Sequence, residues 1–80
     1  MKARVHVSLK SGVLDPQGAA VAHALGTLGF EGVRSVRQGK VLDLDLDETD
    51  PEAARAQVDA MCRQLLANTV VETWRVEILG

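Results

Sequence analysis

The stretch L-K-S-G-V-L-D-P-Q-G, residues 9–18, decides the fold of this 80-residue chain, because it ends a strand, turns and begins a helix. Asp15 is placed as an N-cap whose carboxylate accepts from a free backbone N–H of the first helical turn. Pro16 follows at the first helical position, where its missing N–H costs nothing and its fixed φ suits a helix. Gly12 allows a sharp turn, and Gly18 keeps the first helical turn thin. The stretch contains no nucleophile paired with a base and no set of metal ligands.

The segments on either side of this stretch have different periods. Residues 2–10 alternate between apolar and polar side chains, which predicts a half-buried strand. Residues 16–28 have a helical period, with an apolar stripe formed by Val21, Leu25 and Leu28. The sequence therefore predicts a strand followed by a helix that buries one side.

The middle of the chain predicts a hairpin. Residues 33–38 have a weak strand pattern, and residues 38–40, with a central glycine, are typical of a turn. Residues 41–47 alternate strongly, with leucines on one face and mainly aspartates on the other. We therefore expect a second strand over 33–38 that pairs with a third strand over 41–47.

A second helix and a last strand complete the chain. Residues 49–52 open the helix, capped either by a capping box of Thr49 and Glu52 or by Asp50 with a proline after it. The apolar stripe of this helix consists of Ala54, Val58, Met61 and Leu65. Residues 72–79 alternate again, which predicts a strand.

The order β-α-β-β-α-β predicts a single α+β domain over residues 1–80, with two helices on one face of an antiparallel sheet, as in ferredoxin-like folds. If the strands are ordered four, one, three, two, the first and third are neighbours. Their outward faces then carry opposite charges, Arg4 and His6 against Asp43 and Asp45. Such a face can be solvated or can pair with a second subunit. Because the core of so short a chain is small, we favour oligomerisation.

Composition excludes several classes of function. The net charge is −2, and there are one Phe, one Trp and no Tyr, whereas nucleic-acid binding needs a basic patch and aromatic platforms. No apolar run approaches the ~20 residues of a membrane span, and no signal-peptide core follows Met1. The single Cys62 cannot form an internal disulfide, which favours a reducing compartment. We expect a complete, cytoplasmic protein that binds neither nucleic acid nor a membrane.

The side chains able to carry chemistry form no recognisable active site. His6 and His23 have no hydroxyl or thiol at a useful spacing, and Cys62 lies on the apolar side of the second helix. The aspartates of residues 43–47 alternate with leucines as the wet face of a strand, without the glycine and distant glutamate of a calcium loop. We therefore predict no catalytic residue, no metal and no cofactor bound by this chain.

Two features leave alternatives open. Arg34, Arg37 and Lys40 place a small basic group at the predicted hairpin. A solvated turn is the default interpretation, and a docking contact to an acidic partner is the alternative. Trp74 is interpreted as a core residue, with an interface position as the alternative, because Trp is enriched at binding hot spots.

The first half of the chain resembles one known family. The run K-S-G-V-L-D-P-Q-G at residues 10–18 is followed by L-G-F at 28–30 and R-Q-G-K at 37–40. This combination is similar to the PurS family, the small subunit of phosphoribosylformylglycinamidine (FGAM) synthase. The second half matches that family in length and element order, with less distinctive residues.

The resemblance implies a PurS-like fold and a role in de novo purine biosynthesis. The full enzyme converts formylglycinamide ribonucleotide (FGAR) to FGAM with ATP, Mg and glutamine. Its glutaminase subunit, PurQ, releases ammonia, and its synthetase subunit, PurL, consumes it. The resemblance implies that this chain is an accessory subunit of that ligase, without catalytic residues of its own. It would bridge PurQ and PurL, support ammonia transfer and form a homodimer or homotetramer.

The stereotyped segments are the expected contact surface, because a rigid turn and a capped helix end lower the ordering cost of binding. The residues expected to contact partner or sister subunits are Lys10, Gly12, Asp15, Pro16, Gln17, Arg37, Gly39 and Lys40. For Gly12, Asp15, Pro16 and Gly39, a purely fold-building role is the alternative. The alternative function is a small-metabolite-binding regulatory domain of ferredoxin-like type.

Overall fold

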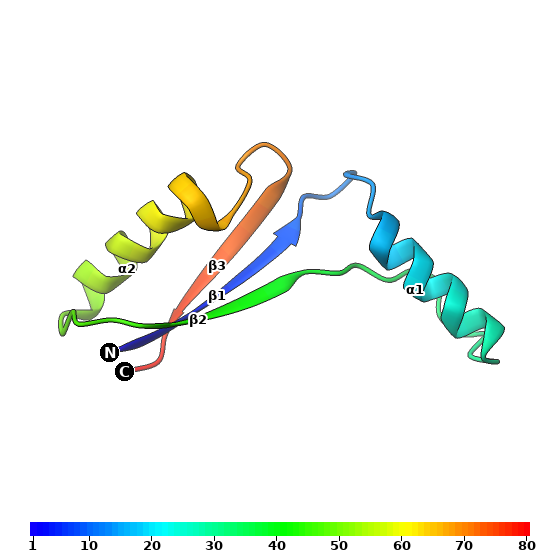
Figure 1. Ribbon diagram of the computed structural model, residues 1–80, viewed down its shortest axis with the longest axis horizontal. Helices are drawn as coiled ribbons and strands as arrows, with labels where there is room; N and C mark the ends of the chain where they lie inside the picture. Colours follow the sequence, from blue (N-terminus) through cyan, green and yellow to red (C-terminus); the bar gives the residue numbers. More distant parts are fainter.

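Three strands, two α-helices and one π-helical turn make up the chain, and the computed structural model describes all of residues 1–80. Figure 1 shows their arrangement along an elongated molecule. The elements are β1 (Lys2–Leu9), α1 (Pro16–Thr27), β2 (Lys40–Asp45), α2 (Pro51–Met61), η1 (Cys62–Leu66) and β3 (Glu72–Ile78). Neither α-helix has the length and hydropathy needed to cross a bilayer.

The strands form one antiparallel sheet in the order β2-β1-β3. This order confirms the prediction that the first strand lies between the strand around residue 43 and the last strand. It also brings the predicted opposite charges together, since the Arg4 Nε atom donates to Asp43 Oδ1 at 2.8 Å. The α+β class and the antiparallel sheet are therefore confirmed.

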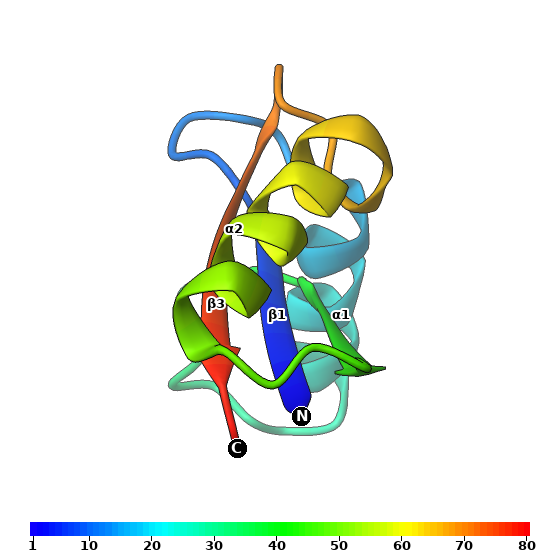
Figure 2. The ribbon, with the colours of Figure 1, turned by 90° about the vertical axis from the view of Figure 1, so that its left-hand side faces the viewer.

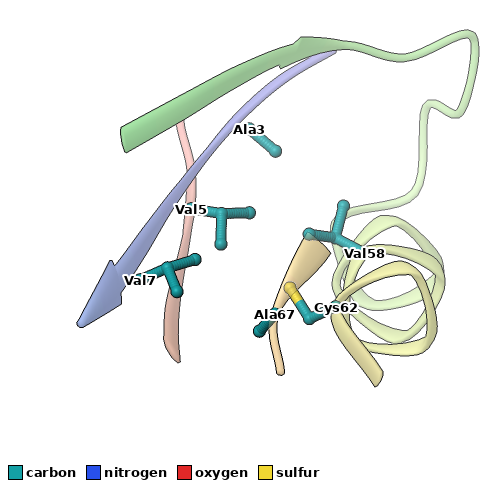
Figure 3. Close-up of a cluster of buried hydrophobic side chains, with 6 residues drawn as sticks. All are labelled: Ala3, Val5, Val7, Val58, Cys62 and Ala67. Atoms are coloured by element: carbon teal, nitrogen blue, oxygen red, sulfur yellow. The ribbon is translucent and has the colours of Figure 1, made fainter. Parts of the chain in front are cut away.

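The hydrophobic core lies between the sheet and the second helix. Figure 3 shows the side chains of β1 pointing toward α2, η1 and the residue that follows them. The core residues are Ala3, Val5, Val7, Val58, Cys62 and Ala67. Central β1 contributes half of this cluster, because strands on both sides and a helix above cover its inward face (Figure 2). Trp74 is half-buried against the cluster, as the core interpretation predicts.

The second helix begins where predicted, but the side chains that it buries differ from the predicted stripe. Asp50 is the N-cap, and its carboxylate accepts from the Glu52 N–H at 3.1 Å. The prediction that Met61 and Leu65 lie on the buried stripe was wrong, since both are exposed. The i, i+4 spacing of the buried Ala54, Val58 and Cys62 turns Met61 and Leu65 away from the sheet.

The predicted strand over residues 33–38 does not form, and the hairpin with it is absent. The segment is irregular and continues directly into β2. Its backbone is tied to the start of α1 instead: the Gln38 N–H donates to Asp15, and the Val36 carbonyl lies against Gly18. With Gln38 held at Asp15 and residues 33–38 running on into β2, the segment does not fold back beside that strand.

The two helices occupy different places relative to the sheet. Helix α2 covers one face as expected, whereas α1 lies beyond the end of the sheet (Figures 1 and 2). The radius of gyration is 15.9 Å, against about 12 Å for a compact chain of this length. We therefore divide the molecule into a sheet lobe (residues 1–9 and 41–80), a junction (10–18 and 36–40) and an arm (19–35).

Candidate partner-contact site at the junction

One carboxylate organises the junction. Asp15 is 7 % exposed; its Oδ1 atom accepts from the Gly18 N–H at 2.8 Å and its Oδ2 atom from the Gln38 N–H at 2.7 Å. These two backbone donors, Gln38 first, lower the pKa of Asp15 from its ordinary value. The predicted N-cap is confirmed, and the same side chain also fixes the chain that returns from the arm.

Two glycines allow the backbones of the junction to approach closely. A Cβ atom on Gly18 would overlap the Val36 carbonyl oxygen, and one on Gly39 would lie 2.5 Å from the Val7 carbonyl oxygen. Real Cβ atoms do not approach backbone oxygens so closely, so each glycine is required by packing. Gly12 has a φ of +85°, which glycine adopts without strain. These contacts favour a fold-building role for the glycines.

Arg37 acts as a clamp inside the junction. Its Nη1 atom donates to the Val13 carbonyl at 2.7 Å, and its Nη2 atom donates to the Lys10 carbonyl at 3.1 Å. The Lys10 ammonium is also engaged, since it donates to the Thr69 carbonyl at 2.9 Å. Sequence reasoning missed both internal roles, because these pairings join residues 24 to 59 positions apart and leave no local pattern.

The remaining predicted residues surround an open groove of about 500 Å³. Gln17 Oε1 accepts from Gln38 Nε2 at 3.1 Å, and Lys40, at the start of β2, also lines the groove. Leu14, which is 80 % exposed, adds an apolar side chain that the list of expected contacts did not include. The full lining is Leu9, Leu14, Asp15, Pro16, Gln17, Gln38, Gly39, Lys40 and Glu72.

The structure thus brings the eight predicted residues into one cluster and sorts them by environment. Lys10, Asp15, Arg37 and Gly39 make internal contacts, and Gly12 supplies a positive φ. Pro16, Gln17 and Lys40 line the groove, together with Asp15 and Gly39. An unpaired apolar side chain in a turn, such as Leu14, is the signal that could have predicted the apolar part of this surface.

The side chains that could take part in catalysis or metal binding lie outside the junction. Each of them is hydrogen-bonded, buried, or exposed without a catalytic partner. His6 on the open face of the sheet hydrogen-bonds through Nε2 to Glu77 Oε1 at 2.5 Å. His23 is exposed on the arm, and Cys62 is fully buried, which raises the pKa of its thiol. No group of three or more His, Cys, Asp or Glu side chains converges as a metal site. The junction, in contrast, is held in one shape by the hydrogen bonds of Asp15 and by close backbone packing.

Comparisons with known proteins agree over nearly the whole chain. The family described as "PurS: Phosphoribosylformylglycinamidine (FGAM) synthase" matches residues 2–80. The phosphoribosylformylglycinamidine synthase subunit PurS of Synechocystis sp. is 49 % identical over 75 residues, which cover 94 % of this chain and 75 % of that protein. The solved structure of Bacillus subtilis PurS is 47 % identical with a TM-score of 0.85, covering 95 % of this chain and 94 % of that one. A chain in the structure of PurLQS from Thermotoga maritima is 32 % identical with a TM-score of 0.86, covering 95 % and 93 %.

Proposed function

Because this chain belongs to the PurS family of phosphoribosylformylglycinamidine synthase subunits, we propose that it is the non-catalytic subunit that bridges the glutaminase PurQ and the synthetase PurL. In this role it supports the transfer of ammonia for the conversion of FGAR to FGAM. Its similarity to a chain of the Thermotoga maritima PurLQS structure supports membership of such an assembly.

The observation that carries the bridging role is the division of the molecule into two separate parts. The chain extends 48 Å along its longest axis but only 14 Å along its shortest. The sheet lobe and the arm lie at opposite ends, joined by the rigid junction (Figure 1). Such an elongated chain exposes more surface than a compact chain of the same length, which supports contact with more than one other protein.

ATP, Mg and glutamine are bound by the other subunits in this proposal. Two carboxylates already have internal donors: Asp43 accepts from Arg4, and Asp59 accepts from Arg63 and the Trp74 indole. The cytoplasm is the proposed location, as for a biosynthetic subunit with a single, buried thiol.

We propose that a second copy of the chain packs against the arm. The accessible surface is 5716 Å², about 1,000 Å² more than expected for a compact monomer of this mass. That excess is similar to the roughly 800 Å² that one partner contributes to a standard interface. Val21, Leu28 and Phe30 of the arm are exposed. We expect a homodimer or homotetramer in which these side chains are buried.

Reconstitution of the synthase tests the function directly. PurL and PurQ are mixed with ATP, magnesium and FGAR, with and without this chain, and FGAM is measured. We expect glutamine-dependent formation of FGAM to require the chain, while ammonia-dependent formation by PurL does not. Equal glutamine-dependent rates with and without the chain would refute the proposed role.

A matched pair of double variants tests the junction as a contact surface. Gln17→Ala with Lys40→Ala removes two groove side chains that build little of the fold. Lys2→Ala with Gln64→Ala removes two exposed side chains of the same kinds outside the groove. We expect only the first pair to lower glutamine-dependent activity several-fold at unchanged ammonia-dependent activity. Full activity of a folded first pair would show that the groove is not a contact surface.

A further inference from the structure

Strand β3 forms one edge of the sheet, and β1 is its only neighbour in the chain (Figure 2). Beside the start of β3, the Lys10 N–H donates to the Val71 carbonyl at 2.8 Å. Since alternate residues of an antiparallel strand point their backbone groups to opposite sides, the odd-numbered residues of β3 bond to β1. The N–H and C=O groups of Trp74, Val76 and Ile78 therefore point away from the sheet.

One of these outward groups is already used within the chain. Arg55 of α2 reaches the edge, and its Nη1 atom donates to the Val76 carbonyl at 3.0 Å. No other hydrogen bond of a turn, cap or side chain reaches the backbone of Trp74, Val76 or Ile78. A charged side chain placed across an edge strand is one of the ways in which proteins prevent another strand from adding there. The guanidinium of Arg55 therefore obstructs the middle of this edge.

Without that side chain, the sequence of β3 would favour the addition of a strand. Its seven residues, E-T-W-R-V-E-I, contain no proline or glycine, and four of them are β-branched or aromatic. Trp74 and Val76 also line an open groove of about 440 Å³ whose other lining residues come from α2. Their side chains are thus accessible at the edge, and an edge strand of this composition is a template for pairing with another chain.

The order of residues along β3 matches a second copy of the same strand. If two β3 strands pair antiparallel with their Val76 residues opposite each other, residues at equal distances before and after Val76 become neighbours. Trp74 then lies beside Ile78 of the second copy, which is a favourable aromatic and β-branched pair, and symmetry repeats it. Arg75 lies beside Glu77 of the second copy, so no like charges meet. Glu77 already accepts from Arg75 and His6 of its own chain, and the affinity therefore comes from the apolar pairs and the backbone.

We propose that the hydrogen bond from Arg55 to the Val76 carbonyl prevents β3 from pairing with β3 of a second copy. In two strands paired about Val76, the Val76 carbonyl of each accepts from the Val76 N–H of the other. The guanidinium and the second strand therefore compete for the same acceptor. This competition limits assembly, because a further self-complementary interface would join assembled copies into larger assemblies. The inference does not rest on the proposed function.

Removal of the guanidinium tests the proposal. Arg55→Ala keeps a good helix former in α2, and Lys2→Ala makes the same change of net charge on β1. The masses of both variants and of the unmodified protein are measured by sedimentation over a range of concentrations. We expect the Arg55→Ala assembly to double in mass as its concentration rises, and the Lys2→Ala assembly to keep the mass of the unmodified protein. Equal masses for all of these proteins at every concentration would overturn the proposal.

Hydrogen exchange shows whether the new contact lies at β3. In Arg55→Ala, the backbone N–H of Val76 should exchange at least tenfold more slowly in the doubled assembly than at low concentration. If the mass doubles while this N–H exchanges at an unchanged rate, the copies associate through another surface and the proposal fails. A slowing with concentration in the unmodified protein would show that β3 pairs despite Arg55, which also overturns the proposal.

A second substitution tests the predicted register. Arg75→Glu brings like charges together beside Glu77 of the second copy, so it should weaken the doubled Arg55→Ala assembly several-fold. In the protein that retains Arg55, Arg75→Glu should leave the mass unchanged, because β3 is not paired there. An unweakened double variant, or an altered mass of the single variant, would contradict the self-complementary pairing.

Discussion

Helix α1 is the more apolar of the two helices, yet it is the less buried. Helix α2 separates an apolar stripe from a charged face, and its stripe supplies Ala54 and Val58 to the interior of the sheet lobe. Helix α1 is apolar around much of its circumference and buries only Gly18. An amphipathic helix can be completed by the sheet of its own chain, whereas a helix apolar on several sides needs additional protein around it. The arm is therefore the part whose structure depends most on assembly.

The junction explains how the arm keeps its orientation in a single chain. A helix of 12 residues without tertiary packing is marginal in water. Asp15 caps α1 and holds Gln38, while Arg37 spans the loop before the helix. Stability in the sheet lobe comes from burial, and in the arm it comes from a few hydrogen bonds at one end.

The largest expected difference between the two parts is seen when a valine is shortened in each. Val58→Ala removes two methyl groups from the core and should lower the free energy of unfolding by about 2–3 kcal/mol. Val21→Ala alters the exposed arm and should change it by less than about 0.5 kcal/mol in the dilute, monomeric chain. Urea unfolding measures both. Equal losses in the monomer would mean that the arm is packed as firmly as the sheet lobe.

The two glycines of α1 give the next largest effect, with opposite signs. Gly18→Ala places a Cβ atom against the Val36 carbonyl and should destabilise the junction by about 1–3 kcal/mol. Gly26→Ala meets no atom within 4 Å and should stabilise the helix by up to about 1 kcal/mol. The helical signal in far-ultraviolet circular dichroism measures both variants. A loss of helix in Gly26→Ala at high protein concentration alone would identify Gly26 as a site of close approach between copies.

The same contrast explains which parts of the fold follow from the sequence. The strands of the sheet lobe alternate strictly, and the predicted neighbours Arg4 and Asp43 pair as expected. The position of α1 could not be predicted, because the stripe of Val21, Leu25 and Leu28 indicates that something covers the helix without indicating what. Residues 33–38 have strand-like composition, and the hydrogen bond from Gln38 to Asp15, 23 residues away, overrides it.

The candidate site was predictable to a similar degree. Asp15, Pro16 and Gly12 follow from local rules for helix starts and turns, so their positions agree with expectation. Arg37 and Lys10 donate to backbone carbonyls of residues remote in sequence. Every residue has a backbone carbonyl, so no residue type in the sequence marks the acceptor. Local chemistry predicts caps and turns, whereas contacts that depend on the assembled backbone need the structure.

Acid should release the arm before the sheet lobe loses its core. The pKa of Asp15 lies below its ordinary value of 3.8, because two backbone N–H groups donate to the ionised carboxylate. A carboxyl whose pKa is lowered by folding stabilises the fold above its unfolded pKa, and this stabilisation is lost as pH falls through the folded pKa. The amide resonances of Gly18 and Gln38 should therefore change together below about pH 4. In Asp15→Asn, which does not titrate, they should not change. Amides that stay constant in the unmodified chain down to pH 2 would contradict this coupling.

The smallest expected effect uses Trp74 as a reporter of the sheet lobe alone. The Arg63 guanidinium carbon lies 5.8 Å from the centre of the indole ring, and Arg63→Ala should cost about 0.5–1 kcal/mol and shift the fluorescence emission to longer wavelength. Arg34→Ala removes the same side-chain type from the arm and should leave the emission unchanged, because the arm lies beyond the end of the sheet (Figure 1). The emission spectra of the two variants are compared at equal concentration. An equal shift in Arg34→Ala would mean that the arm folds back onto the sheet lobe in solution. The distinction between a self-sufficient lobe and an arm that depends on assembly would then have to be abandoned.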